Sequence, residues 1–77
     1  MQKSVREVIG DVLGLAPEGI AEDLSMQNAE GWDSLKHMEI VASLEDEFEI
    51  TFTADEIVSI TSLPAINSTL REKGIAA

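Results

Sequence analysis

The chain has 77 residues, 44% of them hydrophobic, with no cysteine and one histidine, so we expect one small domain held by helix packing rather than by disulfide bonds or zinc. Its 15 acidic and 5 basic residues give a formal net charge of −10, which makes nucleic acid and anionic membranes poor partners. The charge suits docking onto basic patches of other proteins, although an acidic surface also simply keeps a small domain soluble. No stretch approaches the roughly 20 apolar residues of a membrane span, and "MQKSVREVIG" lacks a signal peptide's apolar region, so we expect a cytoplasmic protein. We also expect it to be a monomer.

The first predicted helix covers residues 4–14. Ser4 and Glu7 stand three residues apart, as in a capping box, and Gly14 is a suitable stop. Apolar residues follow the cap at helical spacing: Val5, Val8, Ile9, Val12 and Leu13. Residues 15–32 then form a predicted long loop, since they carry Pro, two Gly and many small polar residues. We expect four apolar residues to pin this loop to the core: Leu15, Ile20, Leu24 and Met26.

The second predicted helix begins after Asp33, a good N-cap, and ends near Glu47–Phe48. One apolar stripe along it is expected to be buried: Ile40, Val41, Leu44 and Phe48. A second, smaller stripe consists of Leu35, Met38 and Ala42. Because one stripe is enough to bury a helix in a small bundle, the second is predicted to stay exposed as a docking surface.

Two further helices complete the predicted fold. Ile50 and Phe52 alternate briefly like a strand, but no second strand-like segment exists for them to pair with. The segment from Thr53 to Glu56 is another capping box, which opens a short helix over 54–59. Ser62 or Leu63 begins the last helix, which has Pro64 in its first turn and ends near residue 73. Three of its residues are expected to face the core: Leu63, Ile66 and Leu70. The fold class is therefore all-α, a small four-helix bundle of three longer helices and a short third one, with residues 1–77 as a single domain.

Three interpretations of Ser34 compete at the start of the second helix. In the first, its hydroxyl only favours the helix N-terminus, a role that Asp33 already fills. In the second, Ser34 is a hydrolase nucleophile with His37 as its base, because residues three apart on a helix are neighbours. The other parts of a hydrolase site are missing: Asp33 would point elsewhere, no G-x-S-x-G elbow is present, and an exposed first turn excludes little water. We therefore expect no catalytic role for His37, which is predicted to be a solvated surface residue.

In the third interpretation, Ser34 is an attachment site that another enzyme modifies. An exposed hydroxyl at a helix start is suitable, because the free amides and the helix dipole favour an anionic phosphodiester. Phosphorylation by a kinase would follow the same logic. Nothing around Ser34, however, resembles a basic or proline-directed recognition sequence.

The segment "GWDSLKHMEIVASLEDEFEITF" resembles the phosphopantetheine attachment segment of acyl carrier proteins and related carrier domains. The family's hallmarks are Asp-Ser-Leu at the start of the second helix, here residues 33–35, and Leu-Glu-x-Glu-Phe at its end, here residues 44–48. "VREVIGDVLGLAPEGI" is similar to the family's first helix and loop, and "TFTADEIVSITSLPAI" to its third helix and the entry to the fourth. The resemblance thus covers essentially the whole chain.

The resemblance implies a carrier rather than an enzyme. A phosphopantetheinyl transferase would move the 4′-phosphopantetheine arm of coenzyme A onto Ser34 Oγ, with Asp33 in a supporting role, and the arm's thiol would hold an acyl group as a thioester. Partners would be acyl-transferring, ketosynthase or ligase-type enzymes with basic docking patches. Five residues fall on positions that contact such partners in the family: Leu35, Met38, Glu39, Glu45 and Glu47. Three would line the space between the second and third helices where an acyl chain can shelter: Phe52, Ile57 and Ile60.

Some residues depart from the family's pattern. Lys36 and His37 stand where carriers of fatty acid synthesis usually have acidic or small polar residues, and Trp32 adjoins Asp33. The resemblance implies a carrier of fatty acid or polyketide synthesis, or of a specialised lipid or surface-polymer pathway, and the departures count against the standard fatty acid synthase. Alternatives are a peptidyl or D-alanyl carrier and a helical interaction domain that is never pantetheinylated. Trp32 itself is expected to anchor the loop on the bundle.

Overall fold

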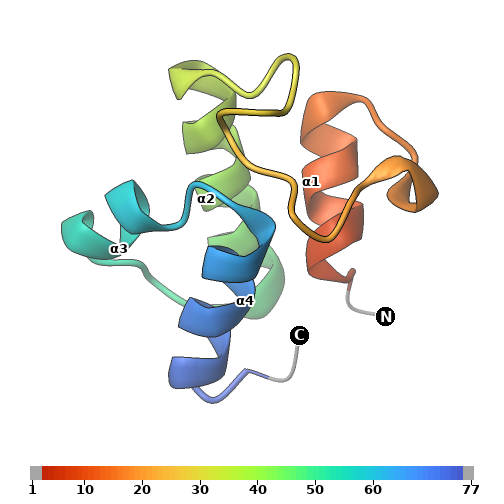
Figure 1. Ribbon diagram of the computed structural model, residues 1–77. Helices are drawn as coiled ribbons and strands as arrows, with labels where there is room; N and C mark the ends of the chain where they lie inside the picture. Colours follow the sequence, from red (N-terminus) through yellow and green to blue (C-terminus); the bar gives the residue numbers. More distant parts are fainter. Residues whose placement is uncertain (1–2, 76–77) are drawn as a thin grey trace.

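The computed structural model describes residues 3–75. Four α-helices and one 3₁₀ turn follow in the order α1 (Val5–Leu13), η1 (Pro17–Gly19), α2 (Ser34–Phe48), α3 (Ala54–Ser59) and α4 (Leu63–Glu72). Helix α1 packs against α2 and α4, while the short α3 lies on the far side of α2 from α1 (Figure 1). The all-α fold with a short third helix is confirmed. A single domain over residues 1–77 stays a prediction, because residues 1–2 and 76–77 lie outside the described residues.

Local sequence signals place the helix starts. The side chains of Ser4, Asp33, Thr53 and Ser62 each accept a hydrogen bond from a backbone N–H in the first turn of α1, α2, α3 and α4, respectively. Both predicted capping boxes are complete, since Glu7 and Glu56 reach back to the N–H of their N-cap residues. Gly14 ends α1 in the left-handed conformation. The predicted starts and ends therefore agree with the structure to within about one residue.

The core is formed by the apolar stripes of the helices. Its largest fully buried side chains are Ile9, Ile40, Leu44, Ile60, Ile66 and Leu70. The loop between α1 and α2 adds Ile20 and Leu24, which are buried as predicted, while Met26 is partly buried against the same cluster. Residues 50–52 form no strand, in agreement with the sequence.

The prediction for Leu15 is wrong, because its side chain is 40% exposed and does not pin the loop. The backbone explains the difference. Leu15 N–H donates to Gly10 O at 2.8 Å, so the chain turns back over the end of α1 by a main-chain hydrogen bond and leaves the side chain outside. The guanidinium of Arg6 also holds the loop by donating to Ile20 O.

Backbone hydrogen bonds join the long loop to the start of α4, a contact that the sequence did not indicate. Met26 N–H donates to Thr61 O, and Leu63 N–H donates to Leu24 O, both at 2.8 Å. They flank an isolated antiparallel bridge between Ser25 and Ser62. The loop is therefore a structural part of the bundle.

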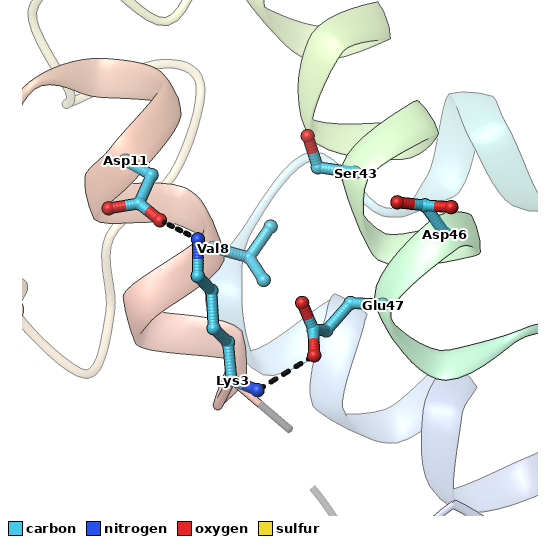
Figure 2. A pocket seen from close by; sticks show the side chains of 6 residues that line it. All are labelled: Lys3, Val8, Asp11, Ser43, Asp46 and Glu47. Carbon is cyan, nitrogen blue, oxygen red and sulfur yellow. Dashed lines mark hydrogen bonds and ion pairs between the residues drawn. The ribbon is translucent and has the colours of Figure 1, made fainter. Parts of the chain in front are cut away.

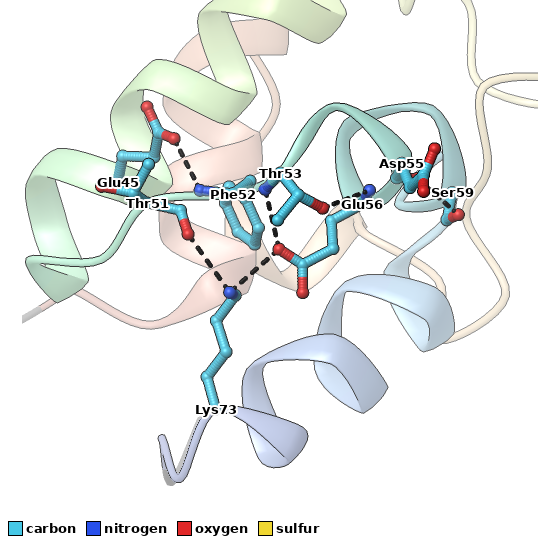
Figure 3. Close-up of polar contacts among 8 residues, drawn as sticks. All are labelled: Glu45, Thr51, Phe52, Thr53, Asp55, Glu56, Ser59 and Lys73. Atoms are coloured by element: carbon cyan, nitrogen blue, oxygen red, sulfur yellow. Dashed lines mark hydrogen bonds and ion pairs between the residues drawn. The ribbon is translucent and has the colours of Figure 1, made fainter.

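Two charged side chains hold the segment between α2 and α3 (Figure 3). Glu45 on α2 accepts a hydrogen bond from Phe52 N–H at 2.8 Å. Lys73, at the end of α4, donates to Thr51 O at 3.2 Å, and its ammonium lies 5.6 Å from the centre of the Phe52 ring. The segment is thus tied both to α2, which it follows directly, and to the distant end of α4.

The same lysine reaches α3. Lys73 Nζ lies 2.9 Å from Glu56 Oε1 (Figure 3). The hydrogen bond from Thr53 N–H, followed by the one from Lys73, lowers the pKa of Glu56 from its usual 4.5. Ionised Glu56 therefore stabilises the fold above that usual value, and the contribution is lost as the pH falls through the lower pKa of the folded state.

We expect Glu56→Gln to destabilise the protein at pH 7. Gln can retain the capping box but cannot form the ion pair with Lys73. The difference in free energy of unfolding from the wild type should shrink as the pH falls below the folded-state pKa. Urea denaturation at a series of pH values measures it, with Glu22→Gln in the exposed loop as the control. A difference that stays constant down to acid pH would contradict the role of the charge.

Gly10→Ala provides a second test of the fold. Alanine normally stabilises a helix interior relative to glycine, by about 1 kcal/mol. At this position, however, a Cβ would come within 2.4 Å of Leu15 O, the carbonyl of the turn that follows α1. We therefore expect a net loss of about 1–3 kcal/mol in unfolding free energy. Gly19→Ala is the control, because a Cβ there meets nothing within 4 Å; equal effects of the two substitutions would refute the close approach.

Candidate functional site at the start of α2

The start of α2 exposes Ser34 and assigns the capping role to its neighbour. Asp33 has an extended backbone, and its Oδ1 accepts a hydrogen bond from Lys36 N–H at 2.9 Å. Ser34 is the first residue of the helix and is exposed. Since the carboxylate of Asp33 fills the cap, the hydroxyl of Ser34 is accessible to another molecule.

The expectation that His37 is a solvated surface residue is wrong, because only 7% of its surface is exposed. Its Nδ1 accepts a hydrogen bond from Trp32 Nε1–H at 3.2 Å, and its Nε2 lies 2.7 Å from Ile57 O. Position 37 lies three and four residues before Ile40 and Val41, so it extends the buried stripe of α2 by one turn. That spacing was the signal in the sequence that could have indicated the burial.

These contacts also determine the tautomer of the His37 imidazole. An indole N–H can only donate and a carbonyl can only accept, so the neutral ring must carry its proton on Nε2. Both ring nitrogens are engaged away from Ser34, which is exposed while His37 is buried. The geometry therefore gives no support to a serine nucleophile with His37 as its base.

Trp32 anchors the loop, as predicted. It is 3% exposed, and its indole is stacked with the His37 ring at an interplanar angle of 25° and a centroid distance of 6.1 Å. The residue therefore holds the loop against the bundle two positions before Ser34.

The second apolar stripe of α2 is exposed, in agreement with the sequence. Leu35 is 70% exposed, and Met38 and Ala42 are exposed as well. Glu39 is exposed beside them and forms an ion pair of 3.5 Å with Lys36. A further exposed apolar residue, Val58 on α3, was not predicted.

The carboxylates of Glu45 and Glu47 both have partners within the protein. Glu45 is half-buried and binds Phe52 N–H, as described above. Glu47 is also half-buried, and its Oε2 accepts a hydrogen bond from Lys3 N–H at 2.8 Å (Figure 2). They therefore stabilise the fold in addition to contributing negative charge.

A pocket lies between α1 and the C-terminal half of α2 (Figure 2). Its lining is formed by Lys3, Val8, Asp11, Ser43, Asp46 and Glu47. Hydrogen bonding and ion pairing with Asp11, at 2.5 Å from Lys3 Nζ, raise the pKa of Lys3. None of the lining residues is among the three predicted to line the acyl space, Phe52, Ile57 and Ile60, so this pocket is distinct from that space.

The three residues predicted to line the acyl space belong to or adjoin the core. Phe52 and Ile60 are buried, and Ile57 is half-buried. Their contribution to an acyl-binding space stays a prediction. Over residues 3–75, no helix has the length and apolar character needed to cross a membrane, and no cluster of three or more side chains suited to hold a metal ion is found.

Comparison with known proteins identifies the family. A family model described as "Phosphopantetheine attachment site" matches residues 3–70. The non-reducing polyketide synthase pigA of Monascus ruber is 32% identical over 68 residues, which are 88% of this chain and 2% of the synthase. The chain thus spans a very small part of that relative. A domain of the matched family is a carrier and not itself catalytic, and such carriers serve synthase and transferase enzymes. The chain belongs to the phosphopantetheine-binding carrier family, whose members hold 4′-phosphopantetheine covalently on a serine.

Proposed function

We propose that Ser34 is the serine that carries 4′-phosphopantetheine. The observation that carries this proposal is the exposed Ser34 in the first turn of α2, relieved of capping by Asp33. Several other serines have local structural roles: Ser4 and Ser62 cap helices, Ser25 bonds within the loop, and Ser59 Oγ donates to Asp55 O.

The start of α2 is chemically suited to a phosphodiester. The helix has 15 residues, and the partial positive charge of its N-terminus favours an anionic group on the first residue. In the transfer, the bond from Ser34 Oγ to phosphorus forms as the pyrophosphate bond of coenzyme A breaks. Adenosine bisphosphate leaves, and the serine proton passes to a base of the transferase. Asp33 supports this step by holding the first turn of the helix in place.

The arm would then carry an acyl group as a thioester on its own thiol, so the chain needs no cysteine. A flexible tether raises the local concentration of that group at each partner's active site. The similarity to a polyketide synthase favours polyketide intermediates over other acyl groups as cargo. We infer that the carrier works in the cytoplasm as a monomer.

Partner enzymes would contact the exposed face of α2. Leu35 and Met38 supply apolar area, and the exposed Glu39 supplies charge for a basic patch. Glu45 and Glu47 add to the negative potential while they hold the fold. Phe52, Ile57 and Ile60 would shelter the acyl chain beside α3.

Incubation with coenzyme A, Mg²⁺ and a broad-specificity phosphopantetheinyl transferase tests the attachment site. We expect the intact mass of the wild type to increase by one phosphopantetheine and that of Ser34→Ala to stay unchanged. Ser68→Ala, at an exposed position on α4, is the matched control and should be modified like the wild type. Modification of Ser34→Ala, or no modification of the wild type, would overturn the proposal.

Docking through charge predicts a dependence on salt. We expect Glu39→Gln to raise the KM of the transferase for the carrier by a factor of roughly 1.5 to 5 at low ionic strength, with a smaller effect in 0.5 M NaCl. Glu22→Gln, which changes the same charge in the loop before α2, should have less effect. An equal effect of the two variants, or one that is independent of salt, would show that Glu39 does not contribute to electrostatic docking.

A further inference from the structure

The imidazole of His37 joins three segments of the chain. It belongs to the first turns of α2, it receives the indole N–H of Trp32 from the loop, and it lies 2.7 Å from Ile57 O in α3. Trp32 and His37 flank Ser34 in the sequence, two residues before it and three after it. Their side chains are buried and bonded to each other, while Ser34 between them is exposed. The contact therefore brackets the residue that we propose as the attachment site.

Helix α3 itself buries little of its surface, and the fully buried Ile60 follows it directly. The helix has six residues, none of which is fully buried, and Val58 is 73% exposed. The last four carbonyls of a helix have no partner within it, and Ile57 O is one of these. Since Nε2 must carry the proton of His37, it donates to this carbonyl and completes the end of α3. The ring that holds Trp32 is thus the hydrogen-bond link between α2 and α3 at this end, beside the buried Ile60 and the ion pair of Glu56 with Lys73.

The two hydrogen bonds of the ring depend on each other. The donation from Trp32 places Nδ1 as an acceptor and sets the plane of the ring, and that orientation aims Nε2–H at Ile57 O. When one bond is removed, the imidazole can rotate about its side-chain torsions, which weakens the other bond. Loss of the hydrogen bond to Trp32 therefore weakens the hydrogen bond to Ile57 O, and loss of the bond to Ile57 O weakens the one to Trp32.

We propose that His37 is a positioning residue that couples α3 to the Ser34 site. A partner that shifts α3, for example by contact with exposed Val58, changes the hold on Trp32 and with it the loop and first turn that present Ser34. The relevance of this coupling to cofactor attachment rests on the proposed function of Ser34. The coupling itself is a property of the fold and can be measured without the cofactor.

Hydrogen–deuterium exchange of the full chain tests the coupling directly. Trp32→Phe keeps an aromatic ring in the loop but removes the indole N–H. We expect faster exchange both at residues 31–36, next to the substitution, and at residues 54–61 of α3, which reach Trp32 through His37. His37→Ala should accelerate exchange in both segments by roughly tenfold, the factor expected when a buried hydrogen bond is lost. Residues 6–12 of α1 serve as the reference.

His37→Gln is the matched control, because its amide has an acceptor oxygen for Trp32 Nε1–H and a donor nitrogen for Ile57 O and can restore both bonds. It should exchange more slowly in both segments than His37→Ala. The KM of the transferase for the carrier should rise for His37→Ala and return toward the wild-type value for His37→Gln. Unchanged exchange in α3 of Trp32→Phe, or acceleration of α1 by the same factor, would overturn the coupling. Modification of Ser34→Ala would instead overturn the proposed attachment site and leave the exchange result standing.

Discussion

The side chains of Ile40, Val41 and Leu44 on α2 are almost completely removed from water, and α1, α4 and the long loop all contribute to the cluster that covers them. A chain of this size can form only one such cluster, so burial is concentrated on one face of α2. The opposite face, with Leu35 and Met38, consequently remains exposed along the same helix. One helix thereby provides both the centre of the core and the surface that a partner can reach.

The acidic composition has a structural use besides docking and solubility. Within residues 3–75, five carboxylates accept hydrogen bonds from backbone N–H groups: those of Glu7, Asp33, Glu45, Glu47 and Glu56. Hydrogen bonds to an ionised acceptor are stronger than neutral ones, which helps a small core that contains no disulfide bonds. Part of the net charge of −10 therefore stabilises helix ends and the connections between helices.

The proposed site at Ser34 suits delivery rather than catalysis. Ser34 is exposed at a helix start, and the nearby imidazole is turned inward to Trp32 and Ile57. A carrier needs a reachable attachment point on a firm base, since its partners supply the catalytic groups. The neighbours of Ser34 provide that base: Asp33 caps the helix, and Trp32 and His37 hold the loop and α3 beneath it.

The sequence by itself determined the four helices, their caps and the apolar stripes, because these depend on residues three or four apart. The same local pattern placed Ser34 at the start of α2 and predicted the exposed stripe of Leu35 and Met38, whereas the role of Ser34 as an attachment site was implied by the family resemblance and is our proposal. Only the tertiary structure decided the features that join distant segments. It turned Leu15 outward, tied the loop to α4, committed Glu45 to Phe52 N–H and buried His37 between Trp32 and Ile57. The partners in these contacts lie from 5 residues apart, for Leu15 and Gly10, to 39 residues apart, for Leu24 and Leu63. No local pattern specifies which backbone group or ring a side chain will meet once the core has closed.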